Sequence, residues 1–234
     1  MTENLKIISA SEYLSKNKKP NQENVWDEIS DLWNEYRKEP FDAVKSFLEE
    51  VSTKSSKKIK IIDLGCGSGR NMIKSENIKY YCVDISSCQL KAATKLAKEK
   101  EISAEFFKLP ADKINKSIFD NETFDYGLFI ATLHCIEGES ERETALREFY
   151  RVLKKGSEAL ITVWNSEDSR FDGLSGDVYM SWKKNSKEYF RYYYLYSKDE
   201  LINLLKKTGF KIIKINDKET DRFSKKNLIV RVKK

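Results

Sequence analysis

One glycine-rich stretch constrains the fold of this chain more than any other feature. Residues 61–64 form an apolar run that carries Asp63, and Gly65, Gly67 and Gly69 follow at every second position. Glycine lacks the Cβ atom that hinders positive φ angles and close backbone approach, so the turn can lie directly against a ligand. A dinucleotide-binding turn would space its glycines as G-x-G-x-x-G instead. The stretch therefore predicts a buried strand and a ligand-binding turn unlike those of nicotinamide enzymes.

Three further runs that are rich in aromatic and β-branched residues predict more strands. The run 79–84 ends in Asp84, about twenty residues after the glycine turn, where a ribose-binding carboxylate is expected. The run 104–107 is followed by Asp112, and the fourth run covers residues 124–130. The carboxyl ends of parallel strands meet at one edge of an open α/β sheet, and such sheets bind ligands there. We therefore expect a ligand site at this edge.

Amphipathic segments between the runs predict the helices of an α/β fold. Residues 86–100 and 141–154 each place apolar residues on one face, which suits crossover connections between parallel strands. Residues 24–51 predict an opening helical region that is broken at Pro40 and that covers the ligand. The remaining predicted elements are a helix that begins with a capping box at Ser197 and a hairpin of strands over residues 211–215 and 227–232.

Length and composition favour one cytoplasmic domain without a metal. A chain of 234 residues that is 40% hydrophobic can bury a substantial core as one α/β unit. The first residues lack the apolar core of a signal peptide, and no apolar stretch approaches the roughly twenty residues needed to span a bilayer. The four cysteines include no C-x-x-C pair and His134 is the single histidine, so we expect neither a metal site nor disulfides.

The glycine turn, Asp84, Asp112 and the run 124–130, in this order and spacing, resemble a class I S-adenosylmethionine-dependent methyltransferase. The resemblance covers most of the chain. It implies a Rossmann-like α/β fold with a mostly parallel seven-stranded sheet, helices on both faces and an insert after the fifth strand. It also implies a single methyltransferase domain over all 234 residues, with an N-terminal helical cap at 1–52 and a substrate-side insert at 165–196. The implied cofactor is S-adenosyl-L-methionine, with S-adenosylhomocysteine as the product.

Other stretches are similar to the tRNA wobble-uridine carboxymethyl methyltransferases. The similarity lies in residues 130–134, 141–148 and 151–164, in Trp33, Tyr36, Arg37 and Pro40, and in two elements of the insert, 177–182 and 191–194. Tyr194 stands where that family usually has histidine, and Cys135 where a second histidine is common. The resemblance implies methyl transfer to the carboxylate of a 5-carboxymethyluridine-type wobble base, which forms a methyl ester. It implies two partners, the tRNA anticodon loop and a small zinc-binding activator subunit in a heterodimer, expected near Phe106 and Phe107.

The resemblance also assigns roles at the strand ends. It implies that Asp63 accepts a hydrogen bond from the cofactor ammonium, that Asp84 takes both ribose hydroxyls, and that Asp112 accepts from the adenine amino group. An unpaired carboxylate at the end of a buried strand would be costly, which favours a ligand role for Asp84. The implied cofactor-binding residues are Asp63, Gly65, Cys66, Gly67, Gly69, Asp84, Ile85, Ala111, Asp112, Ile130 and Ala131.

Placement of the substrate is the main catalytic task that this chemistry sets. A carboxylate is already ionised near neutral pH, and a guanidinium orients it through two parallel hydrogen bonds. Arg191, with Arg37, is therefore the expected clamp, although an ordinary surface ion pair is an alternative for Arg191. His134 completes the predicted catalytic set, where it either shapes the pocket or hydrogen-bonds the substrate, and a purely structural role is the alternative. The predicted substrate-binding residues are Asp177, Trp182, Tyr192, Tyr193 and Lys183.

The net charge leaves several functions open. The value of +6, from 43 basic and 37 acidic residues, is compatible with a nucleic-acid partner without requiring one. Lys183, Lys184 and Lys187 lie in the insert and either contact phosphates or form a solvated face. The alternatives are a methyltransferase of a small quinone or lipid precursor, a non-catalytic RNA-binding subunit of the same fold and, more remotely, a nicotinamide oxidoreductase.

Overall fold

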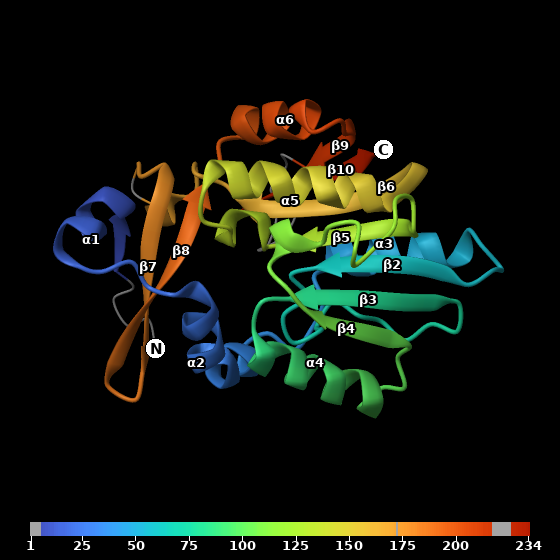
Figure 1. Ribbon diagram of the computed structural model, residues 1–234, viewed down its shortest axis with the longest axis horizontal. Helices are drawn as coiled ribbons and strands as arrows, with labels where there is room; N and C mark the ends of the chain where they lie inside the picture. Colours follow the sequence, from blue (N-terminus) through green and yellow to red (C-terminus); the bar gives the residue numbers. More distant parts are fainter. Residues whose placement is uncertain (1–5, 172, 217–225) are drawn as a thin grey trace.

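A seven-stranded, mostly parallel sheet forms the centre of the fold (Figure 1). The computed structural model describes residues 6–171, 173–216 and 226–234. Neighbouring strands from β4 to β6 are parallel, and β10 and β9 complete the sheet as an antiparallel hairpin. The strand order is β4 (Ala104–Lys108), β3 (Ile78–Asp84), β2 (Ile59–Leu64), β5 (Phe124–Ile130), β6 (Leu153–Trp164), β10 (Asn227–Lys233) and β9 (Lys211–Asn216). This order confirms the predicted fold class and the predicted hairpin.

Helices cover both faces of the seven-stranded sheet, as predicted. Helices α5 (Glu139–Val152) and α6 (Lys198–Lys207) pack on one face, and α3 (Asp42–Thr53) and α4 (Ser87–Glu99) pack on the other. Neighbouring isoleucines of β2 point to opposite faces, so this strand is buried on both sides. The central strands are therefore fixed by apolar contacts from two helical layers, and their carboxyl ends stay in register at one edge.

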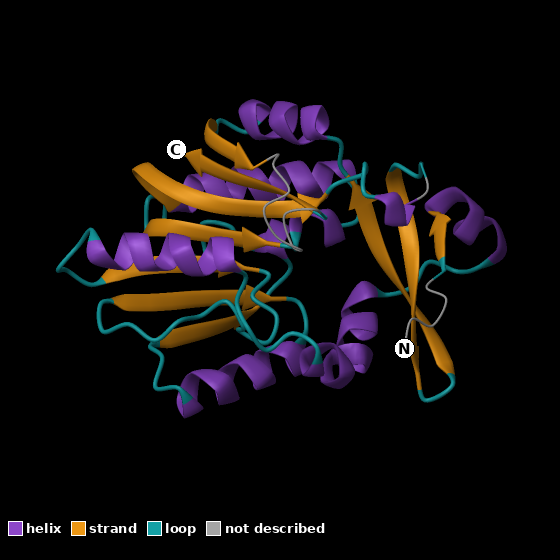
Figure 2. Cartoon of the chain, turned by 180° about the vertical axis from the view of Figure 1, so that it is seen from behind, coloured by secondary structure: helices purple, strands orange, loops and turns teal. Residues whose placement is uncertain are grey.

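The predicted insert folds as a separate, three-stranded antiparallel sheet. Strands β7 (Gly176–Lys184) and β8 (Lys187–Leu195) pair as a hairpin, and β1 (Ile7–Ser9) adds to the free edge of β7. Helix α1 (Ala10–Lys16) packs beside β7, away from the seven-stranded sheet (Figures 1 and 2). The expectation of a wholly helical N-terminal cap is therefore wrong at β1, because the backbone there finds hydrogen-bond partners on a distant edge strand.

Helix α2 (Gln22–Glu35) bridges the two sheets, with contacts to α4 on one side and to β7 and β8 on the other (Figure 1). It ends before Pro40, and α3 begins after it. The predicted opening helical region is thus two helices, separated by residues 36–41, which include Pro40. The connection between these helices faces the edge where the central strands end.

Side-chain caps set several helix boundaries. Ser86 accepts a hydrogen bond from the Gln89 N–H at the start of α4, and Ser197 and Glu200 form the predicted capping box of α6. Helix α5 ends earlier than predicted, because the chain enters β6 at Leu153, opposite Phe124. Short 3₁₀ helices in the described residues are η1 (Ala111–Lys113), η2 (Leu133–Cys135) and η3 (Ser169–Phe171).

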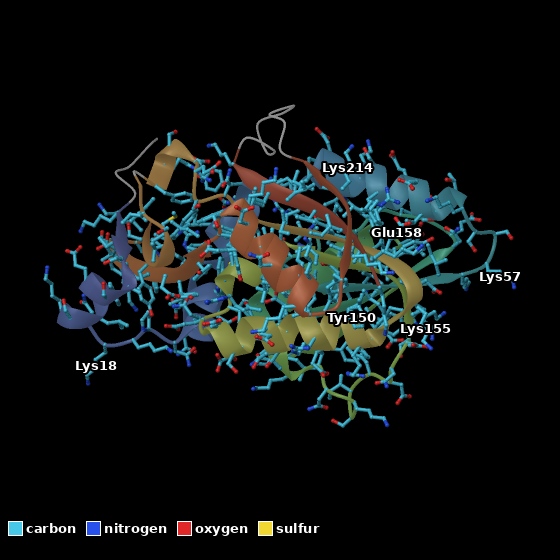
Figure 3. The ribbon with its side chains drawn as sticks, turned by 90° about the horizontal axis from the view of Figure 1, so that it is seen from above. Lys18, Lys57, Tyr150, Lys155, Glu158 and Lys214 are labelled. Carbon is cyan, nitrogen blue, oxygen red and sulfur yellow. The ribbon has the colours of Figure 1, made fainter. Side chains whose placement is uncertain are left out.

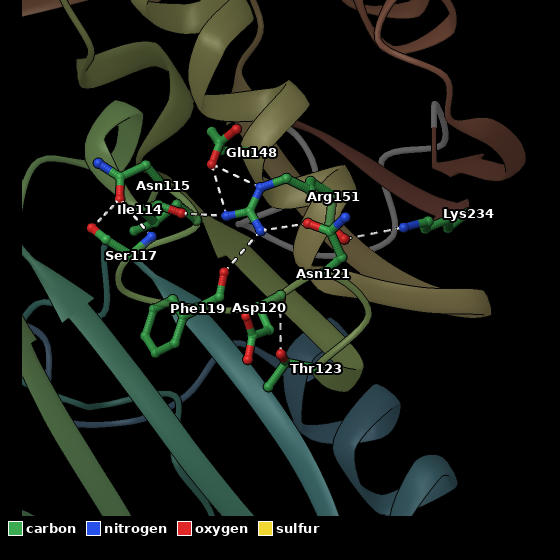
Figure 4. A network of polar contacts seen from close by, with 10 residues as sticks. All are labelled: Ile114, Asn115, Ser117, Phe119, Asp120, Asn121, Thr123, Glu148, Arg151 and Lys234. Atoms are coloured by element: carbon green, nitrogen blue, oxygen red, sulfur yellow. Dashed lines mark hydrogen bonds and ion pairs between the residues drawn. The ribbon is translucent and has the colours of Figure 1, made fainter.

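The side chain of Arg151 ties the end of α5 to the loop that precedes β5 (Figure 4). Its guanidinium donates to the carbonyl oxygens of Ile114 at 2.7 Å and Phe119 at 2.8 Å, and to the Glu148 carboxylate at 2.8 Å. The Lys234 ammonium donates to the Arg151 carbonyl oxygen at 3.1 Å. One arginine thereby satisfies polar groups that the core would otherwise leave unpaired.

Lysine side chains are spread over the molecule rather than gathered on one face. Lys18 and Lys57 lie at opposite ends of the long axis, and Lys155 and Lys214 lie on strands β6 and β9 of the seven-stranded sheet (Figure 3). In the insert, Lys184 is ion-paired with Asp31 at 2.7 Å. This distribution favours solvated faces for many of the lysines.

The residues that the structure describes show neither a membrane-spanning helix nor a cluster of metal ligands. None of the helices among these residues is both long and apolar enough to cross a bilayer. Among the same residues, no three His, Cys, Asp or Glu side chains gather as metal ligands. The cysteines are unpaired, and Cys66 and Cys82 are buried beside the glycine turn and in β3.

Candidate functional site

A cavity of about 430 Å³ opens at the carboxyl ends of β2, β3, β4 and β5. Helix α2 and the segment before it form the opposite wall. The predicted cofactor-binding residues that line this cavity are Gly65, Cys66, Gly67, Asp84, Ile85, Ala111, Asp112, Ile130 and Ala131. The structure therefore brings four strand ends to one cavity, and its volume is typical of small-molecule sites.

The glycine turn is pressed against the end of β5 and against β3. Gly65 has a φ of +77°, and a Cβ atom there would lie 2.1 Å from Cγ2 of Thr132. The Gly65 and Cys66 N–H groups donate to the Val83 carbonyl oxygen at 2.7 and 3.0 Å. Gly69 lies behind the turn and does not line the cavity, since a Cβ atom there would meet Met72 at 2.4 Å. Glycine is required at both positions, at Gly65 for the cavity wall and at Gly69 for packing.

Asp84 ends β3 and presents a fixed carboxylate to the cavity. Its two oxygens accept backbone N–H groups from Gly67 at 2.8 Å and from Ser86 at 2.9 Å. Burial raises the pKa of Asp84 to about 6, although these hydrogen bonds favour the ionised form. Each oxygen keeps lone-pair capacity for a donor in the cavity.

Asp63 is fully buried under the glycine turn, and neither of its oxygens has a hydrogen-bond partner within the described chain. Burial, followed by the charge of Asp84, raises the pKa of Asp63 to about 7. Two amide oxygens in the cavity wall, Oδ1 of Asn71 and Oε1 of Gln89, are also buried without a donor. Unpaired buried acceptors are costly, so this wall fits a ligand that brings hydrogen-bond donors.

Asp27 fastens α2 to the first turn of α4, directly beside Asp84. Its carboxylate accepts from the Ser86 hydroxyl at 2.5 Å, the Cys88 N–H at 3.0 Å and the Ser87 hydroxyl at 3.2 Å. Burial opposes ionisation, but these bonds outweigh it and lower the pKa of Asp27. The contact holds α2 over the cavity, to which the helix contributes Trp26 and Trp33.

Two arginines line the cavity. Arg37, from the connection after α2, lies over the Trp33 ring at 3.5 Å from its centroid. Arg70, which directly follows the glycine turn, lies over the Phe41 ring at 3.9 Å. Arg37 was predicted and Arg70 was not, although its position after the last glycine of the turn was a signal for it.

Arg191 lies behind the cavity wall rather than in it. It is only 2% exposed, and its guanidinium donates to the Tyr193 hydroxyl at 2.8 Å. Aromatic rings surround it, with the Trp33 and Trp182 centroids each at 5.0 Å. Burial excludes the surface ion pair that the sequence had left open. Arg191 instead contacts the same Trp33 ring as Arg37, from the buried aromatic cluster.

His134 is also buried and does not line the cavity. Its Nδ1 accepts the Trp164 N–H at 3.3 Å, and its ring stacks on Trp164 with centroids 5.1 Å apart. Burial lowers the pKa of His134 to about 3, so the imidazole is neutral near pH 7. These contacts favour the structural alternative over a proton-transfer role.

The insert residues form the framework of the three-stranded sheet. The predicted substrate-binding residues Asp177, Trp182, Lys183, Tyr192 and Tyr193 all lie on β7 or β8, and none lines the cavity. The Tyr192 hydroxyl accepts from Arg142 at 2.7 Å and contacts Asp177, whereas Tyr193 stacks on Trp164 at 4.1 Å. Alternation along β8 sends these neighbouring tyrosines to opposite faces, so the predicted cluster is divided.

Comparisons with known proteins agree with this geometry. The family model described as a methyltransferase domain matches residues 55–221. A tRNA (carboxymethyluridine(34)-5-O)-methyltransferase of Schizosaccharomyces pombe is 27% identical over 216 residues, which cover 81% of this chain and 88% of that protein. The protein of the same name from Saccharomyces cerevisiae is 28% identical over 163 residues, which cover 68% of this chain and 54% of that protein. The chain thus spans about half of the Saccharomyces protein.

A solved structure shares the fold over the full length. It is the 1,6-didemethyltoxoflavin-N1-methyltransferase of Burkholderia thailandensis, crystallised with 1,6-didemethyltoxoflavin and S-adenosylhomocysteine. The two structures align with a TM-score of 0.68 and 15% sequence identity, and the alignment covers 100% of this chain and 97% of that one. At this identity the likeness shows the fold alone.

Proposed function

The chain belongs to the methyltransferase domain family, and from this premise we propose that it transfers a methyl group from S-adenosylmethionine to a carboxylate on tRNA. The acceptor is the carboxylate of a 5-carboxymethyluridine-type wobble base, and the product is a methyl ester. The observation that carries the proposal is the arrangement of Asp63 and Asp84 around the glycine turn. The names of the relatives from Schizosaccharomyces pombe and Saccharomyces cerevisiae support the choice of acceptor.

The residues of the cavity, and Asp63 buried behind its glycine turn, fit S-adenosylmethionine. Asp63 has two buried oxygens without a donor, which an ammonium would satisfy, and the fixed Asp84 carboxylate would take the ribose hydroxyls. Asp112, Ile85 and Ala111 line the part of the wall where the adenine would lie. When bound, the cofactor supplies an electrophilic methyl group on its sulfonium.

The protein's task is then to place an acceptor that needs no deprotonation. A carboxylate is ionised at neutral pH and needs no general base. This is consistent with the position of His134, the single histidine of the chain, which is buried, neutral and outside the cavity lining. Arg37 is the predicted clamp residue that faces the cavity, and we propose that Arg191 acts as a positioning residue through Trp33. Orientation by such groups can lower the barrier by several kcal/mol, on the order of 7 or more in favourable cases.

We further propose that residues 1–52 form an N-terminal cap over the cofactor and residues 165–196 a substrate-side insert, and that a small zinc-binding activator docks on the free edge of the large sheet. Strand β4 is an edge strand in the described sheet order, and Phe106 lies on it. An unpaired edge offers backbone groups to a partner. Co-purification that survives gel filtration, and that is lost on Phe106→Lys substitution, would support this contact.

The deciding experiment is transfer of tritiated methyl from S-adenosylmethionine to bulk tRNA from a strain that lacks the enzyme. It is run with and without the co-expressed zinc-binding partner and followed by nucleoside mass analysis. We expect a base-labile methyl ester on the wobble uridine with wild-type protein and none with Asp84→Ala. Asp120→Asn, at an exposed loop position, is the matched control and should label normally.

Two other outcomes redirect the proposal. Binding of S-adenosylhomocysteine without labelled tRNA would contradict the acceptor and leave the small-molecule or the non-catalytic alternative. Absence of S-adenosylhomocysteine binding, measured by calorimetry with the folded protein, would contradict the cofactor itself.

A further inference from the structure

Two arginines reach the same cavity from segments far apart in the chain, whereas the lysine that also lines it, Lys19, is ion-paired with Glu137 at 3.2 Å. Arg37 comes from the connection between α2 and α3, and Arg70 follows the glycine turn after β2. Each guanidinium lies over one aromatic ring, Trp33 for Arg37 and Phe41 for Arg70. A guanidinium carries its N–H donors in a planar fork, which can bind a planar anion at two points.

Neither side chain has a counter-ion in the part of the chain that the structure describes. Arg147, Arg151 and Arg231 are ion-paired with Glu143, Glu148 and Glu50 at 2.7 to 2.8 Å. Arg37 and Arg70 form no such pair with any described carboxylate, although both are partly buried. Both line the same cavity, and burial, with the charge of Arg37 as the second cause, lowers the pKa of Arg70 to about 9.

Two neighbouring cations without an anion are unfavourable, and a bound carboxylate would relieve this cost. Asp63 lies close enough to Arg70 to influence its pKa, yet forms no ion pair with it and has no hydrogen-bond donor. The wall therefore presents unpaired cations, and an unpaired anion is buried behind the glycine turn. This is the charge pattern that a zwitterionic amino-acid group would complement.

We propose that Arg37 and Arg70 form a carboxylate-binding subsite in the cavity. The inference rests on the proposed function, because two carboxylates could occupy the subsite. One is the α-carboxylate of the amino-acid part of the cofactor, and the other is the carboxymethyl group of the substrate base. Arg191 does not belong to the subsite, because it is enclosed by aromatic rings behind the wall.

The first arm of the test measures cofactor binding by titration calorimetry. S-adenosylhomocysteine is compared with its decarboxylated analogue on wild type, Arg70→Gln and Arg37→Gln. If the subsite takes the cofactor carboxylate, each substitution weakens S-adenosylhomocysteine by about 10- to 100-fold, the range for a charged hydrogen-bonded pair. Binding of the decarboxylated analogue should stay the same in all three proteins.

The second arm measures substrate binding with anticodon stem-loops. One stem-loop carries 5-carboxymethyluridine and the other carries the neutral 5-carbamoylmethyluridine. If the subsite takes the substrate carboxylate, the substitutions weaken the acidic stem-loop and spare the neutral one, while S-adenosylhomocysteine binds as before. Either pattern supports a carboxylate subsite, and together the arms identify its source.

The proposal would be overturned if the substitutions weakened the binding of S-adenosylhomocysteine and its decarboxylated analogue equally, and of the acidic and neutral stem-loops equally. It would also be overturned if they weakened no binding at all. Arg147→Gln, an exposed ion-paired arginine on α5, is the matched control and should leave every affinity unchanged. Arg70→Lys keeps the charge and should recover part of the affinity. If the glutamine variants fail to fold, the wild-type protein alone tests the proposal. Equal wild-type affinity for S-adenosylhomocysteine and its decarboxylated analogue, and for the acidic and neutral stem-loops, would contradict the subsite. Failure of the proposed function is recognised separately, since wild type would then bind neither S-adenosylhomocysteine nor the acidic stem-loop.

Discussion

The carboxylate of Asp27 accepts a hydrogen bond of 2.5 Å from the hydroxyl of Ser86, two residues beyond the cavity-lining Asp84. One contact thereby links α2, which covers the cavity, to the helix start that supports the ribose-side carboxylate. A carboxylate at a helix N-terminus is also favoured by the helix dipole. The position of α2 is therefore coupled to the position of the backbone that supports Asp84.

Replacement of Asp27 by alanine tests this coupling. We expect a loss of about 1–2 kcal/mol in unfolding free energy, the usual cost of a lost helix cap. S-adenosylhomocysteine affinity should fall with it, because α2 is released from the cavity. Chemical denaturation and calorimetry measure the two effects. Asp31→Ala, on the same helix and paired only with Lys184 among the ion pairs of the described residues, is the control and should leave affinity unchanged.

Alanine substitutions at Gly65 and Gly173 separate steric clash from backbone strain. Both glycines have a φ of +77°, so alanine should cost about 1 kcal/mol at either position through strain alone. Only at Gly65 would the new Cβ meet Thr132, and nothing lies within 4 Å at Gly173. We expect an added loss of about 1–3 kcal/mol for Gly65→Ala, together with lost cofactor binding. Equal destabilisation of the two variants would contradict this account of the turn.

Cofactor affinity should depend on pH through Asp63. Its pKa is raised to about 7, whereas an ammonium donor needs the ionised form, so binding should release a proton and weaken as pH falls from 8 to 6. As pH falls below 7, we expect the dissociation constant of S-adenosylhomocysteine to rise by up to about tenfold per pH unit, which is the slope for one proton. Asp63→Asn should bind more weakly and show a flatter profile. Calorimetry in two buffers of different ionisation enthalpy would detect the released proton.

The ligand-free protein should show the opposite pH trend in stability. The folded-state pKa values of Asp63 and Asp84, about 7 and about 6, both lie above the ordinary value of 3.8. The folded chain then binds more protons than the unfolded chain between pH 4 and 7, so this contribution is largest below pH 4 and is lost as pH rises through 6 and 7. Thermal unfolding of Asp63→Asn against wild type would isolate the contribution. If the difference in stability between wild type and Asp63→Asn stayed constant between pH 4 and 7, this account would be contradicted.

Arg151 should contribute to stability without affecting binding. Arg151→Gln removes bonds to the carbonyl oxygens of Ile114 and Phe119 (Figure 4), and neither of these residues lines the cavity. We expect a loss of about 2–3 kcal/mol, because partly buried acceptors lose a charged donor. Arg147→Gln breaks only an exposed pair and should cost at most about 0.5 kcal/mol. Urea denaturation measures both, with S-adenosylhomocysteine affinity as the check on binding.

Local sequence patterns were sufficient to predict where the strands end and where most helices begin and end. The apolar run before Asp63, the alternating glycines and the capping box at Ser197 depend on residues close together in the sequence. Such features specify φ angles, caps and burial without reference to distant parts of the chain. For this reason the sequence alone was enough to predict the parallel sheet and the residues at its carboxyl edge.

Tertiary packing decided which charged side chains meet in the cavity. Strand β8 alternates its side chains between two faces, so Arg191 points into an aromatic cluster with Tyr193 while Tyr192 points to Arg142. Arg37 and Arg70 are 33 positions apart and come together only because α2 is held over the glycine turn. Likewise, β1 is a strand because β7 offers it an open edge. The sequence by itself determined the elements and the strand-end acids, whereas side-chain direction and long-range contacts, which depend on the whole packed chain, selected the arginines of the site.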